Sequence, residues 1–217
     1  MKDTSNFCLP KDKLVKGLIL LLSFVVLNVM SQSSYGQSNV GVKLFGVSYH
    51  PFAENNEALH KIPLDRNNDW LLEPGFTFTY ETGTGFSLTS AKLMQSIYLD
   101  QASQPAGMTY FGIHRKIFHL YKNMITIGIG PTLFYRSDWS TIDGYQEDLD
   151  YKTMGNIQYK MAWITGEIEY VYYVSKRSDM LLSINMLHPK AFTMMIGYRF
   201  WISKKAKRKA CDCPGFK

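Results

Sequence analysis

The side chains of this sequence alternate between apolar and polar with a period of two over most of residues 40–202. Successive side chains of a β-strand point to opposite faces, whereas an amphipathic α-helix repeats its apolar positions about every 3.6 residues. In the last alternating segment, one face collects only apolar side chains: Phe192, Met194, Ile196, Tyr198, Phe200 and Ile202. The opposite face includes Thr193, Gly197 and Arg199. The pattern predicts an all-β protein.

Eight segments carry this alternation and are expected to be strands: 40–50, 70–81, 84–99, 106–118, 124–136, 161–174, 179–188 and 192–202. Within the third segment the alternation changes phase near Lys92, which predicts a β-bulge at that point. The number of strands is even, as in bacterial membrane barrels. We therefore expect an eight-stranded antiparallel up-and-down transmembrane β-barrel.

Alternation alone also fits a soluble barrel, and the connections favour the membrane class. A soluble barrel keeps its apolar side chains inside, whereas a membrane barrel turns them outward to lipid and lines its lumen with polar groups. With both barrel ends in the periplasm, the outer connections are 51–69, 100–105, 138–160 and 189–190. The inner connections are 82–83, 119–121 and 175–178. Apart from the last outer hairpin, at Pro189-Lys190, longer outer loops alternate with short inner turns, which is typical of a transmembrane barrel.

Aromatic residues gather at the strand ends, where their amphipathic rings favour the lipid–water boundary. They are Trp70, Tyr80, Tyr135, Trp139, Tyr170, Tyr172, Tyr173, Tyr198 and Trp201. Aromatic residues also have a high intrinsic preference for strands. Together with the loop lengths, the pattern favours an aromatic girdle at each membrane surface.

Residues 191–202 (AFTMMIGYRFWI) resemble the closing strand of bacterial outer-membrane barrels, with Gly197, Tyr198 and Phe200 matching its aromatic signal in kind. The chain as a whole resembles the OmpA/OmpX-like class of eight-stranded barrels over 40–202. The resemblance implies recognition by the barrel-assembly machinery and residence among outer-membrane lipid and lipopolysaccharide. In that class the signal ends the chain, whereas here a 15-residue tail follows it.

The first 36 residues are typical of a secretory signal peptide. Lys11, Lys13 and Lys16 precede a short apolar run, 17–27. This run is part of only about 14 mainly apolar residues, fewer than the ~20 that a membrane-spanning helix needs. Small residues before Gln37 predict cleavage after Gly36. The expected division is a signal peptide at 1–36, a barrel at 37–202 and a basic tail at 203–217.

The positive net charge of +6 belongs to the two ends of the chain. Residues 37–202 hold 14 basic and 15 acidic residues, so the barrel offers no general surface for nucleic acid. The tail carries six basic residues and one acid, a composition typical of a disordered segment that helps to hold topology. A periplasmic contact with anionic lipid, cell-wall material or another partner is the alternative. The sequence leaves three states open for Cys211 and Cys213: reduced thiols, ligands of a metal ion, or a bond to a partner. The Cys-Pro-Phe ending is similar to tails on outer-membrane proteins of Bacteroidota.

Charged residues on the polar faces predict a lumen filled by ion pairs. An eight-stranded barrel is narrow enough for side chains to fill it, which argues against a diffusive pore. The acids expected there are Glu73, Glu81, Glu167 and Glu169, and the expected bases are Lys43, Lys116, Arg136 and Arg199.

No cofactor or complete active site can be read from the sequence. His188 lies where lipid A deacylase barrels carry a catalytic His, but Lys190 stands where their Ser would be. No pair of histidines has convincing metal-ligand spacing. The acids Asp143, Glu147, Asp148 and Asp150 are candidate oxygen ligands for Ca²⁺ or Mg²⁺. Their spacing misses the known calcium-loop pattern, which favours a solvated outer loop instead.

Three functions remain open from the sequence. The first is a structural or surface-interaction role in the outer membrane through loops 51–69 and 138–160. The second is a lipid A or lipopolysaccharide-modifying acyl hydrolase or acyltransferase centred on His188. The third is a soluble periplasmic barrel that binds an apolar ligand.

Overall fold

The computed structural model describes residues 37–51, 59–83, 88–146, 150–187 and 191–202. The chain divides into two compact units, residues 1–36 and 37–217, and the second contains all of the described structure. The predicted signal peptide, His188 and both tail cysteines therefore lie outside the described residues. Within the described ranges, no helix is long and apolar enough to cross a membrane.

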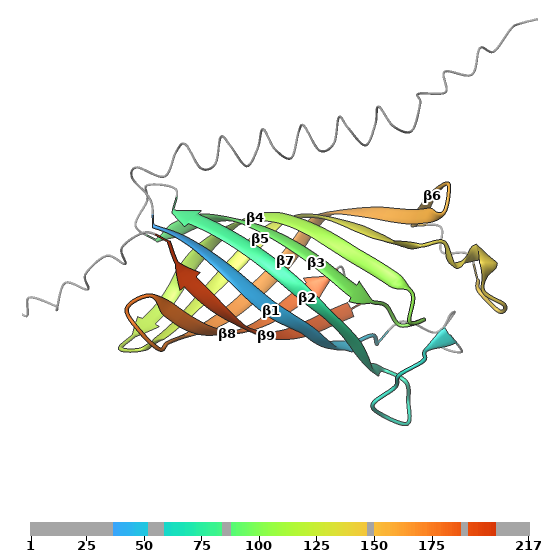
Figure 1. Ribbon diagram of the computed structural model, residues 1–217, viewed down its shortest axis with the longest axis horizontal. Coiled ribbons are helices and arrows are strands. Elements are labelled where there is room, and N and C mark those ends of the chain that lie inside the picture. Colours follow the sequence, from blue (N-terminus) through green and yellow to red (C-terminus); the bar gives the residue numbers. More distant parts are fainter. Residues whose placement is uncertain (1–36, 52–58, 84–87, 147–149, 188–190, 203–217) are drawn as a thin grey trace, which may run out of the picture. The chain divides into compact units, whose positions relative to one another are not determined.

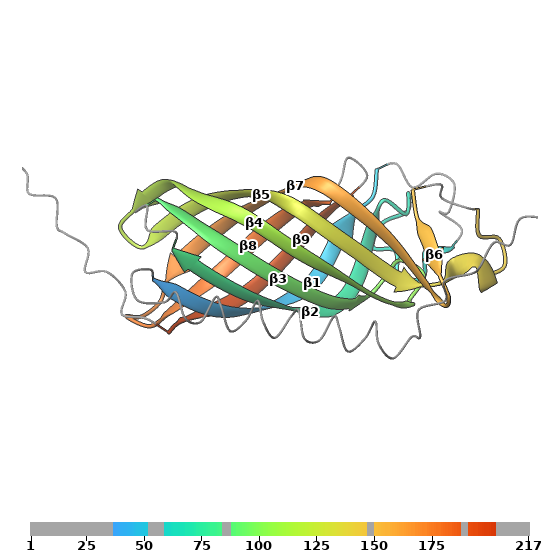
Figure 2. The same ribbon diagram turned by 90° about the horizontal axis from the view of Figure 1, so that it is seen from above.

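Within the described residues, eight antiparallel strands pair into a closed barrel, which can be followed in Figures 1 and 2. They are β1 (Ser38–Tyr49), β2 (Trp70–Gly83), β3 (Thr89–Leu99), β4 (Pro105–Leu120), β5 (Asn123–Ser137), β7 (Ile157–Tyr173), β8 (Ser178–Leu187) and β9 (Ala191–Trp201). Each strand pairs with the next along the chain, and β9 pairs with β1 to close the ring. The predicted eight-stranded antiparallel up-and-down barrel is confirmed.

The two ends of the barrel differ in their connections, as the loop lengths predicted. We call one the turn end, which includes the connections at 121–122 and 174–177. The other is the loop end, which carries the connections at 50–69, 100–104 and 138–156. In both ribbon views β6 (Lys152–Met154) lies at the opposite end of the barrel from the start of β1 (Figures 1 and 2).

The long connection after β5 has more structure than the sequence predicted. It contains a 3₁₀ turn, η2 (Trp139–Thr141), and the short strand β6, which forms a hairpin with the beginning of β7. Gly155 in this hairpin has a φ of 65°, a backbone conformation that glycine adopts without a Cβ penalty. As a result β7 begins at Ile157, four residues before the predicted start at 161.

The predicted bulge near Lys92 is wrong. The register of β3 runs without a break against both neighbours, and Lys92 shares the lumen face with Met94 and the other buried residues of the strand. Two glutamates in the lumen neutralise the charge of Lys92, so this residue can point inward and no bulge is needed to turn it toward the outside. The register shifts that the structure contains lie at 45–47, 116–118 and 130–132.

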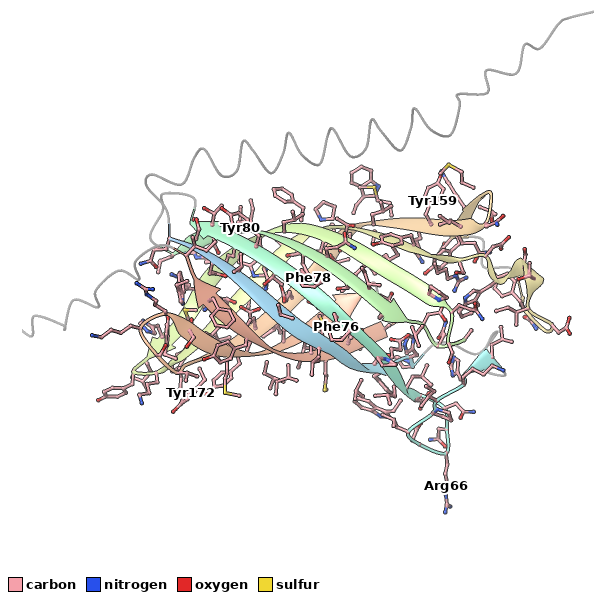
Figure 3. The ribbon with its side chains drawn as sticks, viewed as in Figure 1. Arg66, Phe76, Phe78, Tyr80, Tyr159 and Tyr172 are labelled. Carbon is pink, nitrogen blue, oxygen red and sulfur yellow. The ribbon has the colours of Figure 1, made fainter. Side chains whose placement is uncertain are left out.

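The outer surface of the barrel is apolar. Phe76, Ile127 and Phe200 point outward and remain 57%, 43% and 51% exposed, respectively. Phe76, Phe78 and Tyr80 follow one another along the outside of β2 (Figure 3). In a membrane barrel, large apolar side chains at outward positions contact lipid. Exposing the same side chains to water would be costly. A soluble barrel with an apolar interior would place them inside.

Aromatic side chains mark both ends of the apolar surface. Tyr49, Trp70 and Phe192 cluster at the loop end, with ring centroids 4.8 and 6.5 Å from that of Tyr49. Tyr170 and Tyr172 face outward near the turn end. Three predicted girdle residues do not lie on the outer surface. Tyr173 is half-buried on the lumen side, where it packs against Met124, Val171 and Leu181. Trp139 and Trp201 are buried, because each indole N–H donates to a carboxylate within the protein.

A small polar group on the outer face satisfies its own hydrogen bonds. Gln95 donates to the hydroxyl of Tyr135 and to two main-chain carbonyls, and its oxygen accepts a bond from Thr109 (2.7 Å). Polar groups are tolerated beside hydrocarbon only when they are paired in this way. The group is therefore compatible with a lipid-facing surface.

Candidate functional site

A dense ionic network fills the middle of the lumen. The ammonium of Lys43 lies 2.6 Å from Glu167 and 2.7 Å from Glu169, and that of Lys92 lies 2.8 and 2.7 Å from the same two carboxylates. Lys43 also donates to the hydroxyl of Ser183. All four charged side chains are almost completely buried. Each charge is offset by opposite charges at hydrogen-bond distance, as burial requires.

Arg199 extends this network toward the turn end. Its guanidinium lies 3.0 Å from Glu81, 3.2 Å from Asp179 and 3.5 Å from Glu169. Asp179 also accepts the indole N–H of Trp201. Four strands, β2, β7, β8 and β9, are thereby connected through one planar cation, whose several donors suit this role better than a lysine would.

His114 lies at the edge of the network, and a glycine makes room for its ring. Its Nε2 is 3.3 Å from Glu167 and 3.1 Å from the hydroxyl of Tyr110. Gly128 faces this ring from β5, and a Cβ at that position would stand 2.2 Å from two ring atoms. A glycine in the middle of a strand is explained here by the close approach of a neighbouring side chain.

The structure brings together five of the eight residues that the sequence proposed for the lumen: Lys43, Glu81, Glu167, Glu169 and Arg199. The other three lie elsewhere. Glu73 and Arg136 are at the loop end, and Lys116 is half-buried with no ion pair to any described residue. Sequence reasoning missed Lys92 and Asp179. The even spacing of Lys92 from Met94 would have placed it in the lumen had no bulge been assumed.

Apolar and sulfur-containing side chains occupy other parts of the lumen. One cluster consists of Met94, Met108, Tyr110, Phe134, Ala162 and Met195. A second, smaller cluster joins Met124, Val171 and Leu181 on β5, β7 and β8. Flexible methionines fill irregular gaps well. The lumen of this barrel is thus filled by side chains, as expected for eight strands.

At the loop end, Trp139 holds three connections together. Its side chain is fully buried against Leu59 and Ala102, which belong to the other two described loops. The indole N–H donates to Asp100 at 2.8 Å. The guanidinium of Arg136 lies 3.8 Å from the Trp139 ring centroid and 3.9 Å from that of Tyr151. We call these side chains the loop cluster.

Two carboxylates fix the backbone of this cluster. Asp100 accepts hydrogen bonds from the amides of Ala102 and Gln104, and its burial raises the pKa of the carboxyl above the usual range. Asp138 accepts bonds from the amide and hydroxyl of Ser140, and these hold its pKa below the usual range. The loops are consequently ordered by specific contacts.

Ser48, His50 and Glu73 form a small cluster near the loop end, but its geometry does not suit catalysis. The ring of His50 is 3.0 Å from the hydroxyl of Ser48, which donates to Glu73. In a hydrolytic triad the acid orients the other ring nitrogen of the His, whereas Glu73 and Ser48 here face the same nitrogen. Ser48 is also fully buried, so its oxygen is closed to a substrate.

The acidic stretch after β5 is only partly described. Asp143 and Asp150 are exposed, and Asp150 pairs with Lys160 at 2.6 Å. Glu147 and Asp148 lie outside the described residues. Among the residues that the structure does describe, no group of three potential ligands is placed to hold a metal ion.

Comparisons with known proteins found similar folds only. No family model and no curated protein matches the chain. Among solved structures, it is similar to the N-terminal β-barrel domain of Pseudomonas aeruginosa OprF (12% identity, 76% of this chain and 98% of that one, TM-score 0.44). It is also similar to Ail of Yersinia pestis (13%, 76% and 97%, 0.40) and to Neisserial surface protein A (9%, 77% and 97%, 0.43).

Proposed function

We propose that this protein is an outer-membrane β-barrel with a closed lumen and a structural or surface-interaction role. The observation that carries the proposal is the distribution of polarity across the barrel wall. Outward positions such as Phe78 and Ile129 are apolar, whereas the lumen holds the ionic network of Lys43 and its partners. Only a barrel surrounded by hydrocarbon is stabilised by that arrangement.

The direction of insertion follows from the two barrel ends. Short connections face the periplasm and the loop end faces outward, which is the usual arrangement in bacterial membrane barrels. The segment 1–36 would be the cleaved export signal. The aromatic end of β9, with Gly197, Tyr198 and Phe200, would be read by the assembly machinery. The tail at 203–217 would then remain in the periplasm.

The loop cluster supports an interaction role for the outer face. Loops fixed by Trp139 lose little conformational entropy when a partner binds, so contacts made by their exposed residues translate more fully into affinity. Arg66 projects from the connection between β1 and β2 (Figure 3), and Leu64 beside it is also exposed. We propose that this surface meets lipopolysaccharide or a surface partner through loops 51–69 and 138–160.

The proposal is tested by locating and unfolding the full-length protein. We expect it in the outer-membrane fraction, migrating faster on gels before heating than after. Phe78→Arg places a charge on the lipid face at a cost of about 2–4 kcal/mol and should reduce membrane insertion. Leu64→Arg, in an exposed loop, serves as the matched control and should insert normally. A water-soluble wild-type protein, or normal insertion of Phe78→Arg, would contradict the proposal.

A further inference from the structure

Among the described residues, the exposed charges at the turn end have a single sign. Arg115 on β4, Lys122 in the turn at 121–122, and Lys176 and Arg177 in the turn at 174–177 are all exposed. We call these four residues the turn-end rim. None of them forms an ion pair with a described residue. The rim is therefore a cationic surface without compensation from the described part of the barrel.

The acids at this end are turned inward. Glu81, Glu169 and Asp179 are buried in the lumen, and all three are paired with Arg199. Arg199 thus neutralises these three carboxylates inside the lumen, and they do not form ion pairs with the residues of the rim. The loop end differs, because Lys160 pairs with Asp150 there. At the turn end the cations are exposed and the acids are buried, so this end, unlike the loop end, favours an anionic partner.

The backbone holds parts of the rim close to one another. The carbonyl of Lys122 accepts the amide of Tyr173 at 2.8 Å, which joins the first turn to the end of β7, directly before the second turn. The carbonyl of Arg177 accepts the amide of Trp201 at 2.9 Å, which fixes the second turn to the closing strand. Three cations are thus carried by two anchored, adjacent turns, an arrangement that a headgroup with one or two phosphates can contact.

Apolar side chains separate these cations. Ile117, Leu120 and Tyr121 are exposed in the segment between Arg115 and Lys122, and Tyr121 is 80% exposed. Arg115 continues the outward row of Ile113 and Ile117, so its aliphatic stem lies along the lipid face. A polar cell-wall polymer would leave these apolar groups in water. The boundary of a phospholipid leaflet accommodates both kinds of side chain.

We propose that the turn-end rim binds the phosphates of anionic glycerophospholipids in the periplasmic leaflet of the membrane. Lys122, Lys176 and Arg177 contact the headgroup, and Arg115 reaches phosphate from the lipid face. This inference deepens the proposed function and rests on it, since it requires an inserted barrel. It assigns a lipid class to one end of the molecule.

The test uses full-length protein in nanodiscs of phosphatidylethanolamine with a minor fraction of phosphatidylglycerol. Native mass spectrometry measures the ratio of the two lipids that remain bound. The rim variant is Lys122→Gln/Lys176→Gln/Arg177→Gln. Each cation near a membrane surface contributes about a fivefold preference for anionic lipid, so the ratio should fall at least about tenfold. The control, Lys61→Gln/Arg66→Gln/Lys152→Gln, removes the same charge from the loop end. Exposed acids such as Asp143 and Asp150 offset the bases there, and these nanodiscs contain no lipopolysaccharide for that surface to bind, so the control should change the ratio less than about twofold.

Both variants keep residues 203–217, so any contribution of that basic segment cancels. An unchanged ratio in the rim variant, or an equal fall in the control, overturns the inference. Loss of sedimentation with purified peptidoglycan, with the lipid ratio unchanged, would assign the rim to the cell wall and also overturn it. If the wild-type protein fails to insert, the proposed function fails and the inference with it. If all three proteins insert, the lipid ratio alone decides.

Discussion

Lys43 is the residue whose replacement tests the lumen network most directly. Its ammonium donates to Glu167, Glu169 and Ser183 at 2.6, 2.7 and 3.0 Å. Lys43→Met keeps much of the aliphatic length but removes the charge. Two buried carboxylates would then share Lys92, with Arg199 3.5 Å from one of them.

The expected cost follows from what remains. Removing one partner of a buried ion pair costs about 3–5 kcal/mol, because the remaining charge stays out of water. Lys92 still reaches both carboxylates, which places Lys43→Met near the lower limit, at about 3 kcal/mol. Adding Glu167→Gln removes the surplus negative charge. The double variant should therefore be more stable than the sum of the two single changes, by about 1–2 kcal/mol.

The assay is urea unfolding of the barrel in lipid vesicles, followed by tryptophan fluorescence. Lys61→Met removes an exposed loop cation and should change the free energy of unfolding by less than about 0.5 kcal/mol. If Lys43→Met is as stable as this control, the ionic network does not stabilise the barrel. Additive effects in the double variant would likewise refute the reasoning.

Three further predictions concern the glycine contact and the loop cluster. Gly128→Ala should lower the free energy of unfolding by about 1–3 kcal/mol, because its Cβ would meet the His114 ring, whereas Gly166→Ala has ordinary contacts and should be near neutral in the same assay. Trp139→Ala should speed proteolytic cleavage of the loops at least about tenfold while the barrel keeps its heat-modifiable migration, and unchanged cleavage would show that the loop cluster does not order the loops. Burial raises the pKa of Asp100, so its folded form holds a proton to higher pH than its unfolded form; the loop stability of wild type relative to Asp100→Asn should fall as pH rises from about 4 through the raised pKa. Hydrogen exchange across this range measures the difference, and an increase with pH would contradict the assignment.

The number of strands and most of their faces could be predicted from the sequence, because the two-residue period is a local property of the chain. The alternation places Met194, Ile196 and Phe200 on one apolar face before any contact is considered, and the structure exposes all three on the outer surface. The local sequence pattern does not by itself explain why Gly128 and Gly197 are glycines. The side chains that approach them come from neighbouring strands, so the reason for each glycine depends on register.

The partners inside the lumen were decided only by the closed barrel. Lys43 and Glu167 are 124 residues apart, and they meet because β9 pairs with β1 and so brings β7 and β8 around to the first strand. Trp139 shows the same limit, since its aromatic character fits a membrane girdle as well as a loop interior. Its burial required Leu59 and Ala102 from two other connections. Alternation along one strand determines which way a side chain points, whereas ring closure and register determine which distant side chain it meets.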